Sequence, residues 1–153
     1  MPYLPVLFDY NAKFAEETLK ALRTVPHEKF LTEKISGHGS LRDTMVHIIQ
    51  TEDYWLHKVI CGEQFTRYNV ADFANIDSLE KQWRRVHEEY RQLLASLTAD
   101  ALQEKRKVTW DKEYEFALET VLQHVYTHTV HHRGQVIAGI RLLGGEPPYV
   151  DII

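Results

Sequence analysis

Helical periodicity is the feature that most constrains the fold of this chain. Apolar residues recur at intervals of three and four over long stretches, the spacing that places side chains on one face of an α-helix. These stretches cover residues 7–24, 40–60, 77–97 and 118–143 of the 153-residue sequence. A helix with one apolar face must bury that face against another element. Four such helices in one chain therefore predict an all-α four-helix bundle.

The ends of these segments carry boundary signals. Ser40 is a favourable N-cap for the second helix. Asp77, with Glu80 three residues later, resembles the start of a capping box and predicts the beginning of the third helix. Gly144-Gly145 ends the fourth helix, and Pro147-Pro148 prevents it from resuming.

The segments between the predicted helices read as connections. Residues 27–39 contain two glycines and predict a loop, and residues 62–76 lack a clear period. Thr98 can start a short further helical turn. Residues 107–116 alternate in character and carry aromatic and β-branched side chains, which predicts a small β-hairpin before the last long helix.

Length and charge indicate one globular domain that spans residues 1–153. Lys and Arg number 18 and Asp and Glu 22, which gives a formal net charge of −4. The basic clusters at residues 84–85 and 105–107 are short and surrounded by acidic residues. This balance disfavours a nucleic-acid partner.

The N-terminus and the cysteine content bear on the compartment. No signal peptide is recognisable, and no apolar run approaches the ~20 residues of a membrane span. We therefore expect a cytoplasmic protein with no membrane partner. The single cysteine, Cys61, excludes an intrachain disulfide and a cysteine-based zinc site. Its position at the end of a predicted helix predicts a buried thiol.

Histidine is the compositional anomaly, with nine in the chain. His124, His128 and His132 follow one another at intervals of four, so they share one face of the fourth helix. Adjacent members can bind one metal ion together, but eight residues of helix span ~12 Å, which is too far for all three to share one ion. His47 lies among apolar residues of the second helix and is the best candidate for a further ligand. Tyr54 is nearly in phase with it and is expected to line the same cavity.

Three histidine ligands leave a coordination position open for water, the pattern of catalytic zinc sites. Two simpler interpretations stay open: an HxxxH pair can be a polar helix face, and a buried histidine is often hydrogen-bonded in a core. His131 is expected at the surface. The remaining histidines look incidental: His27, His38, His57 and His87.

Two other classes of metal site are disfavoured by sequence. The zincin motif H-E-x-x-H needs Glu after its first histidine, whereas Thr129 follows His128. Carboxylate-bridged di-iron bundles need Glu-x-x-His on two helices, and no Glu in the chain has His three residues later.

The residues discussed so far resemble the DinB family of small helical-bundle proteins. The C-terminal part of the resemblance consists of His128-x-x-x-His132-Arg133-Gly134-Gln135, Leu143-Gly144, Pro147-Pro148 and Asp151-Ile152-Ile153. The second part is His47 within an apolar helix, followed by Glu52 and Trp55. The match runs from the second helix to the C-terminus.

The resemblance implies an up-down-down-up bundle that pairs as a homodimer and binds a divalent metal, Zn or Ni. The matching metal ligands are His47, His128 and His132. His124 fits the pattern one turn away from the metal, where it would support the site. Gln135, Tyr54 and Trp55 are expected to line the pocket.

Three hypotheses for the function follow. The first is a metal-dependent enzyme that transfers a low-molecular-weight thiol to an electrophilic small molecule, as related families do with bacillithiol, mycothiol or glutathione. The second is a metal-dependent hydrolase with the same ligands and a bound hydroxide. The third is a non-enzymatic, stress-related bundle that binds a small molecule or a protein around a structural metal. No general base can be named from the sequence.

Overall fold

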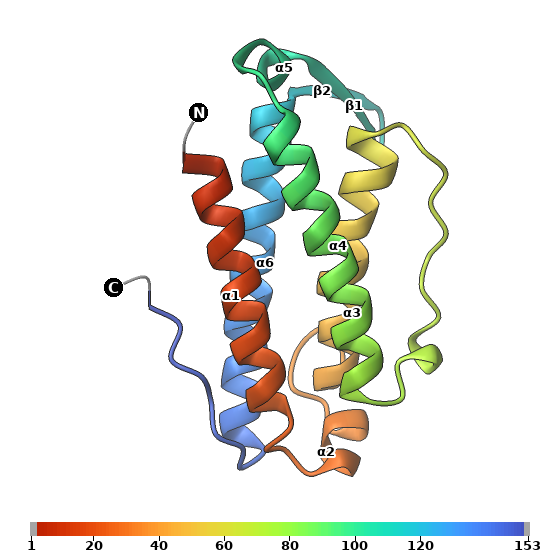
Figure 1. Cartoon of the computed structure of the whole chain (residues 1–153). Helices are drawn as coiled ribbons and strands as arrows, with labels where there is room; N and C mark the ends of the chain where they lie inside the picture. Colours follow the sequence, from red (N-terminus) through yellow and green to blue (C-terminus); the bar gives the residue numbers. More distant parts are fainter. Residues whose placement is uncertain (1–2, 152–153) are drawn as a thin grey trace.

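Helices dominate the computed structural model, which describes residues 3–151 (Figure 1). Four long α-helices form its body: α1 (Tyr3–Leu22), α3 (Leu41–Tyr54), α4 (Ile76–Ser96) and α6 (Leu118–Leu142). Shorter elements connect them: α2 (His27–Thr32), the π-helix η1 (Trp55–Ile60), the 3-10 helix η2 (Val70–Asp72), α5 (Ala99–Gln103), β1 (Lys105–Thr109) and β2 (Glu113–Ala117). The predicted helical bundle with a hairpin before its last long helix is confirmed.

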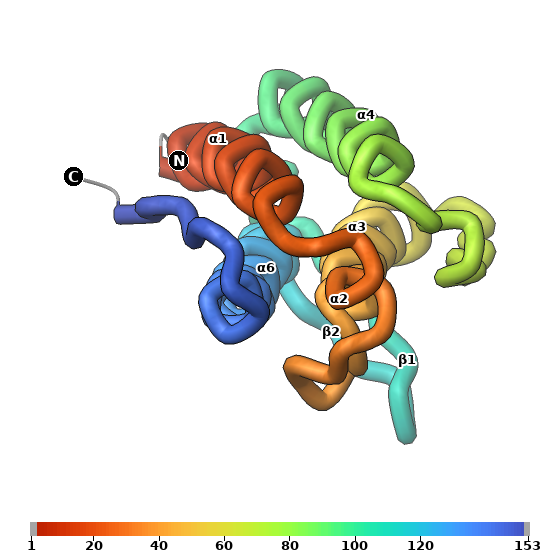
Figure 2. The backbone as a smooth tube through the Cα atoms, turned by 90° about the horizontal axis from the view of Figure 1, so that it is seen from below, coloured from red at the N-terminus to blue at the C-terminus, as the bar shows by residue number. Residues whose placement is uncertain are grey.

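The four long helices run up-down-down-up, as the family resemblance implies. In Figure 1, α1 and α6 run downward, whereas α3 and α4 run upward. The consecutive helices α3 and α4 are parallel because residues 61–75 return along the outside of the bundle before α4 begins. Seen from below, α1 lies beside α4 and α6, and α3 lies beside the same two helices (Figure 2). This arrangement packs α3 directly against α6.

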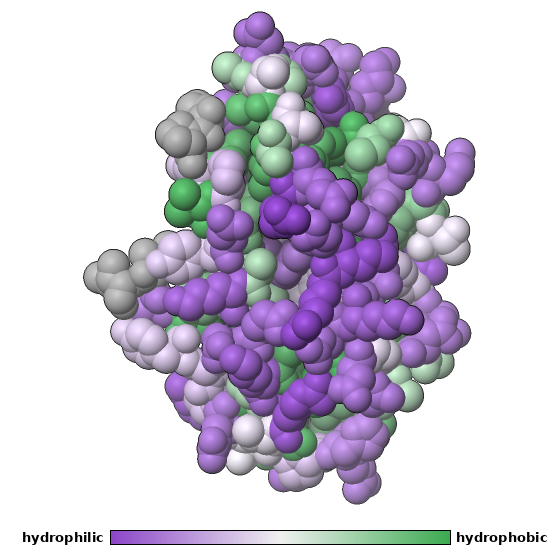
Figure 3. All heavy atoms as spheres, in the orientation of Figure 1, coloured by the Kyte–Doolittle hydropathy of each residue, from purple (hydrophilic) through white to green (hydrophobic). Residues whose placement is uncertain are grey.

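Apolar side chains from all four long helices fill the centre of the bundle. Trp83 and Tyr90 of α4 are among the largest fully buried side chains. Further fully buried residues come from α1, α3 and α6: Leu4, Leu22, Leu41, Met45, Ile48, Ile49, Leu118 and Leu122. Hydrophilic side chains cover most of the face drawn in Figure 3. Within residues 3–151, no helix combines the length and the apolarity needed to cross a membrane.

Side-chain caps fix two of the predicted helix starts. Ser40 Oγ accepts a hydrogen bond from the Asp43 backbone N–H at 3.2 Å, and Asp43 Oδ2 accepts one from the Ser40 N–H at 3.1 Å. This reciprocal pair is a capping box. Thr98 caps α5 in a simpler way, since its Oγ1 accepts from the Ala101 N–H at 3.2 Å. Both predicted starts are confirmed.

The predicted start of α4 at Asp77 is wrong. Asn75 is the N-cap, and its Oδ1 accepts a hydrogen bond from the Ser78 backbone N–H at 2.9 Å. Glu80 does not complete a capping box, because its carboxylate binds the Arg23 guanidinium of α1 at 2.6 Å. Asn and Asp cap helices about equally well, so the sequence alone did not distinguish these two neighbouring candidates.

Residues 27–39 were expected to form a loop, but their first half is the helix α2. Phe30 anchors this helix, since its side chain is completely buried in the core. A six-residue helix spans less than two turns, which is too short for apolar periodicity to be visible in the sequence.

Cys61 is exposed, so the prediction of a buried thiol is wrong. The residue follows the last turn of η1 and precedes Gly62, which has a positive φ of 73°. The chain leaves the bundle at this point, and the last buried positions are Val59 and Ile60.

The hairpin lies between α5 and α6. Its strands pair in antiparallel register, with Lys107 opposite Glu115 and Val108 opposite Tyr114. Val108 is its buried residue, with 1% exposure, and packs into the main core. The hairpin therefore closes one end of the bundle, directly before α6 begins at Leu118.

Candidate metal centre

The three histidines predicted as ligands meet between α3 and α6. His47 Nε2 and His128 Nε2 are 3.2 Å apart. The ring centroid of His132 lies 4.6 Å from that of His47 and 4.4 Å from that of His128. His128 and His132 are neighbours because residues four apart share one helix face. His47 reaches them because α3 packs against α6.

His38 belongs to the same cluster, so the expectation that it is incidental is wrong. Its ring stacks on His47 with centroids 3.8 Å apart and lies 4.8 Å from the ring of His132. Ligand nitrogens of these three residues all lie within 4.8 Å of one another. Helical spacing says nothing about a residue in a loop, and the only sequence signal was the pair of glycines on either side of His38.

Glycines place the turn that carries His38. Gly39 has a φ of 111°, a region that favours glycine, and its carbonyl accepts a hydrogen bond from the Ile35 N–H at 2.9 Å. On α6, a Cβ atom at Gly139 would lie 2.5 Å from Ile35 Cδ1. The absence of a side chain at Gly139 thus lets the turn approach α6, next to the other histidines.

Burial favours the neutral imidazole form of His47, His128 and His132. It lowers the pKa of His47 to about 4, helped by the nearby charges of His38 and His132. It lowers the pKa of His128 to about 3, with smaller contributions from His132, His47 and His124 that outweigh the opposite effect of Glu52. Burial also lowers the pKa of His132, although the hydrogen bond that His132 donates to Gln135 opposes the change. Neutral imidazole is the form that binds metals.

The cluster fits a small divalent ion. Imidazole nitrogen is a good ligand for zinc and nickel. In a tetrahedral site with Zn–N bonds of about 2.0–2.1 Å, two ligand nitrogens are about 3.3 Å apart, which is close to the 3.2 Å between His47 and His128. His128 Nδ1 is buried without a hydrogen-bond partner among residues 3–151. The Nε2 atom of His128, not Nδ1, faces His47, so the unpaired Nδ1 does not mark the position of the ion.

Gln135 fixes the orientation of His132. Gln135 Oε1 lies 2.9 Å from His132 Nδ1. An amide oxygen can only accept, so Nδ1 carries the proton and Nε2 keeps its lone pair for a metal. Gln135 Nε2 in turn lies 3.2 Å from Nε2 of His131, which is exposed as expected.

The other predicted pocket residues lie farther along the two helices. His124 is one turn from His128, with ring centroids 6.0 Å apart, and it packs edge-on against Trp55 at 4.7 Å. Trp55 is buried. Tyr54 packs on Trp55 and on Phe65 of the long connection, at 6.0 and 5.4 Å. His124 and Trp55 thus extend the cluster, whereas no ring contact joins Tyr54 to a histidine in the described part of the chain.

Glu52 organises the core behind the histidines. Its carboxylate is buried and accepts hydrogen bonds from Asn11 Nδ2 at 2.9 Å, Trp83 Nε1 at 2.5 Å and Thr129 Oγ1 at 2.6 Å. These donors belong to α1, α4 and α6, so one side chain of α3 joins all four long helices. Thr129 directly follows His128. The hydrogen bond from Thr129 to Glu52 therefore fixes the position of α6 along the axis of α3.

Arg133 and His87 extend this buried network. Arg133 donates to Asn11 Oδ1 at 3.0 Å, and its guanidinium lies over the Phe14 ring. His87 Nε2 lies 3.3 Å from Glu52, so its expected incidental role is wrong. Despite burial, His87 and the hydrogen bonds from Thr129 and Asn11 lower the pKa of Glu52.

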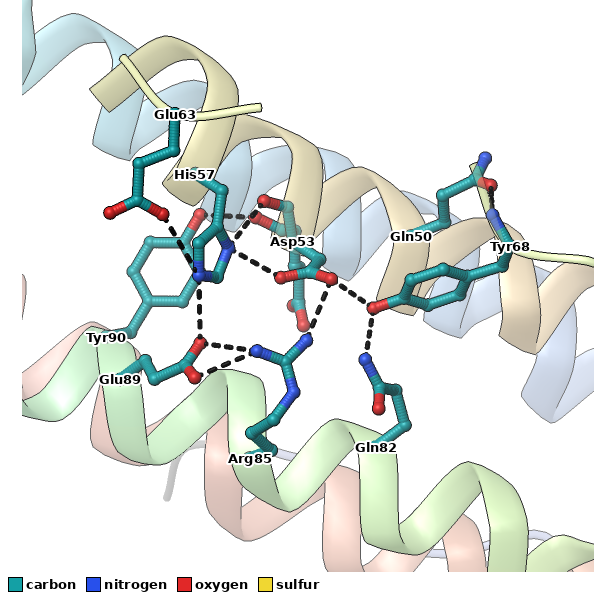
Figure 4. Close-up of polar contacts among 10 residues, drawn as sticks. Gln50, Asp53, His57, Glu63, Tyr68, Gln82, Arg85, Glu89 and Tyr90 are labelled. Atoms are coloured by element: carbon teal, nitrogen blue, oxygen red, sulfur yellow. Dashed lines mark hydrogen bonds and ion pairs between the residues drawn. The ribbon is translucent and has the colours of Figure 1, made fainter. Parts of the chain in front are cut away.

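A second polar network joins α3 and η1 to α4 (Figure 4). Asp53 is buried, and its carboxylate binds His57 Nδ1 at 2.7 Å, the Arg85 guanidinium at 2.8 Å and the Tyr68 hydroxyl. Arg85 also binds both oxygens of Glu89. His57 was expected to be incidental and is a structural residue instead. The donor set Asp53, His57 and Glu89 is of a kind that could hold a metal, but Arg85 already binds both carboxylates.

A cavity of about 490 Å³ opens beside the histidine cluster. His38 and His47 line it, together with Gln50 of α3 and with Arg67 and Tyr68 of the long connection. The candidate metal centre is therefore accessible to a small molecule from the side of α3 that residues 61–75 cover.

Comparison with known proteins agrees with this architecture. The family model of the DinB family matches residues 1–153. YizA, an uncharacterized protein of Bacillus subtilis (strain 168), is 22% identical over 146 residues, which cover 95% of this chain and 91% of YizA. The crystal structure of a DinB-like protein from Bacillus cereus ATCC 10987 superimposes with a TM-score of 0.67 at 21% identity, over 89% of each chain. Residues 152–153, part of the C-terminal resemblance, lie outside the described residues. Because the family model matches the whole chain, the protein belongs to the DinB family.

Proposed function

We propose that this protein is a metal-dependent enzyme that transfers a low-molecular-weight thiol to an electrophilic small molecule. His47, His128 and His132 would hold a divalent ion, zinc or nickel. The observation that carries the proposal is the meeting of His47, His128 and His132 between α3 and α6, with a 3.2 Å nitrogen–nitrogen separation beside an open cavity that His47 lines.

The bound ion would lower the pKa of a thiol or of water so that its anion is available at neutral pH. The protein's own residues hold the ligands ready for that ion. Gln135 keeps the His132 proton on Nδ1, and the Glu52–Thr129 hydrogen bond fixes His128 and His132 at the level of His47. Preformed ligands reduce the free energy that ordering the site would otherwise cost.

The geometry also supports a second candidate, a closed structural site in a non-enzymatic bundle. Structural zinc is normally held by four protein ligands, and His38 lies close enough to His47 and His132 to be the fourth. Cobalt-substituted protein separates the two candidates. In the open site, added thiol changes the visible spectrum and His38→Ala does not. In the closed site, His38→Ala changes the spectrum and thiol has no effect.

The hydrolase alternative uses the same ligands with a metal-bound water as the nucleophile. It differs from thiol transfer in its co-substrate. A product formed from an ester or amide substrate without added thiol would favour hydrolysis, whereas a product that contains the thiol sulfur would favour transfer.

Turnover tests the proposal directly. Zinc- or nickel-loaded protein is assayed with chlorodinitrobenzene and, in turn, glutathione, bacillithiol and mycothiol. We expect metal- and thiol-dependent product that is lost in His47→Ala and retained in His27→Ala, which changes an exposed histidine far from the site. A loaded protein that gives no thiol adduct with a panel of such electrophiles would contradict the proposal.

Assembly and location complete the proposal. We expect a homodimer in the cytoplasm, with a small-molecule substrate and without a nucleic-acid or membrane partner. The homodimer rests on the family resemblance, and the nucleic-acid expectation rests on the net charge of −4. Sedimentation equilibrium gives the oligomeric state, and a monomer at micromolar concentration would contradict it.

A further inference from the structure

The cavity beside the histidines has an unusual charge balance. Two charged side chains line it, Asp43 and Arg67. Asp43 is already neutralised: its Oδ1 lies 3.0 Å from the Arg42 guanidinium, and its Oδ2 accepts the capping hydrogen bond from Ser40. Arg67 has no hydrogen bond or ion pair with any of the residues 3–151. The cavity therefore presents one uncompensated positive charge.

Most other arginines on the surface are paired. Arg23, Arg84, Arg85 and Arg91 each bind at least one carboxylate of α1, α3 or α4. Arg67 differs from them although the chain carries an excess of acidic residues. A guanidinium that faces a cavity without a protein partner is suited to a planar anion, because its N–H groups match the two oxygens of a carboxylate.

The backbone that carries Arg67 is held in place. The Tyr68 backbone N–H donates to Gln50 Oε1 of α3 at 2.7 Å. The Tyr68 hydroxyl bonds to Asp53 and receives a hydrogen bond from Gln82 of α4 at 2.5 Å, as Figure 4 shows. The ring of Tyr68 also stacks on Phe73. Arg67 is therefore presented to the cavity from an anchored position next to α3.

We propose that this cavity binds a small molecule that carries a carboxylate, with the carboxylate on Arg67 and the reacting end toward His47. The inference rests on the proposed function and specifies the class of substrate. The carboxylate can belong to the thiol co-substrate or to the electrophile. In both cases Arg67 selects anionic over neutral molecules of the same length.

Matched thiols test the proposal on zinc-loaded protein. The probes are mercaptoacetate, mercaptopropionate and mercaptobutyrate, each compared by calorimetry with the neutral alcohol of the same length. We expect at least one carboxylate to bind about tenfold more tightly than its alcohol, since a charge-assisted pair contributes about one factor of ten or more. Arg67→Gln should abolish this preference, and Arg67→Lys should restore part of it. Arg141→Gln, a change outside the cavity lining, should leave the preference unchanged.

A second arm separates the two sources of the anion and the two hypotheses. Glutarate, which lacks a thiol, is titrated into isotope-labelled parent and Arg67→Gln protein and followed by NMR. Glutarate shifts at the cavity that are lost in Arg67→Gln would support the anion site even if no thiol binds, and would assign the anion to the electrophile. Neutral thiols that bind as well as their carboxylates, together with glutarate shifts that are absent or independent of Arg67, would overturn the inference and leave the proposed function standing. Failure of all thiols and of glutarate would overturn both.

Discussion

Two polar clusters lie on the same helix, α3, and differ in how their hydrogen bonds are satisfied. Glu52 is buried and has donors from three other helices. His47 and His128 are half-buried, and their rings and that of His132 contact one another rather than donors of other helices. A satisfied network stabilises a unique fold, whereas a cluster with unused lone pairs is suited to bind a ligand. The comparison assigns stability to Glu52 and metal binding to the histidines.

The largest expected effect is the loss of the Glu52 network. Glu52→Ala removes the shared acceptor of Asn11, Trp83 and Thr129 and leaves three buried donors unpaired. We expect a decrease of about 3–5 kcal/mol in the free energy of unfolding, measured with urea on metal-free protein. Glu88→Ala on the exposed face of α4 is the control and should change stability by about 0.5 kcal/mol or less. A decrease below about 1 kcal/mol for Glu52→Ala would contradict the assignment of stability to the Glu52 network.

Gln135 should affect metal binding more than stability. Gln135→Leu removes the acceptor that orients His132. Loss of such a supporting hydrogen bond typically lowers metal affinity by about 10–100-fold, and competition with a chromogenic chelator measures this change. Gln123→Leu, on an exposed part of the same helix, is the control. An unchanged affinity in Gln135→Leu would show that Gln135 does not orient a ligand.

Acid should weaken the metal-free protein through the histidine cluster. The pKa of His47 is lowered from 6.5 to about 4 and that of His128 to about 3. As the pH falls from 6.5 toward these values, the unfolded chain binds protons that the folded cluster does not, so stability falls through this window. A variant with both His47→Gln and His128→Gln should lose less stability over the same range in urea titrations with chelator. Equal losses in parent and variant would contradict the assignment.

His38 should contribute least to the stability of the metal-free protein. It is exposed on a turn that other contacts already hold. His38→Asn is expected to change the free energy of unfolding by about 0.5 kcal/mol or less, as measured by thermal and urea unfolding. A loss above about 1 kcal/mol would mean that the stacked pair of His38 and His47 is part of the structural core.

Periodicity was sufficient to predict the four long helices, and it placed His128 and His132 on one helix face. The residue preference for Ser at helix N-caps identified Ser40, because a cap is a local interaction. The apolar neighbours of His47 made it the best candidate for a further ligand, and the family resemblance added the expectation that it meets the α6 histidines, since nothing local specifies which helices are neighbours. Their role as metal ligands stays a prediction.

Most of the features that were missed depend on tertiary contacts. His38 reaches the cluster through a glycine turn that fits against Gly139, a residue 101 positions later in the chain. Asn75 caps α4 in place of Asp77, and Glu80 pairs instead with Arg23 of α1. His57 pairs with Asp53, four residues earlier, a helical spacing that was visible in the sequence but was not used. Its contact with Glu89 and the contact of His87 with Glu52 join different helices and leave no periodic pattern in the sequence.

Metal content is the measurement that tests the central claim most directly. Tag-free protein, reconstituted with zinc or nickel and dialysed, is analysed by mass spectrometry beside His47→Ala, His128→Ala and His132→Ala. His27→Ala serves as the control. We predict about one ion per chain in the parent and the control, and loss of the ion in each of the three other variants while their helical circular dichroism is retained. A parent that retains no metal after reconstitution, or ligand variants that retain it fully, would contradict the account.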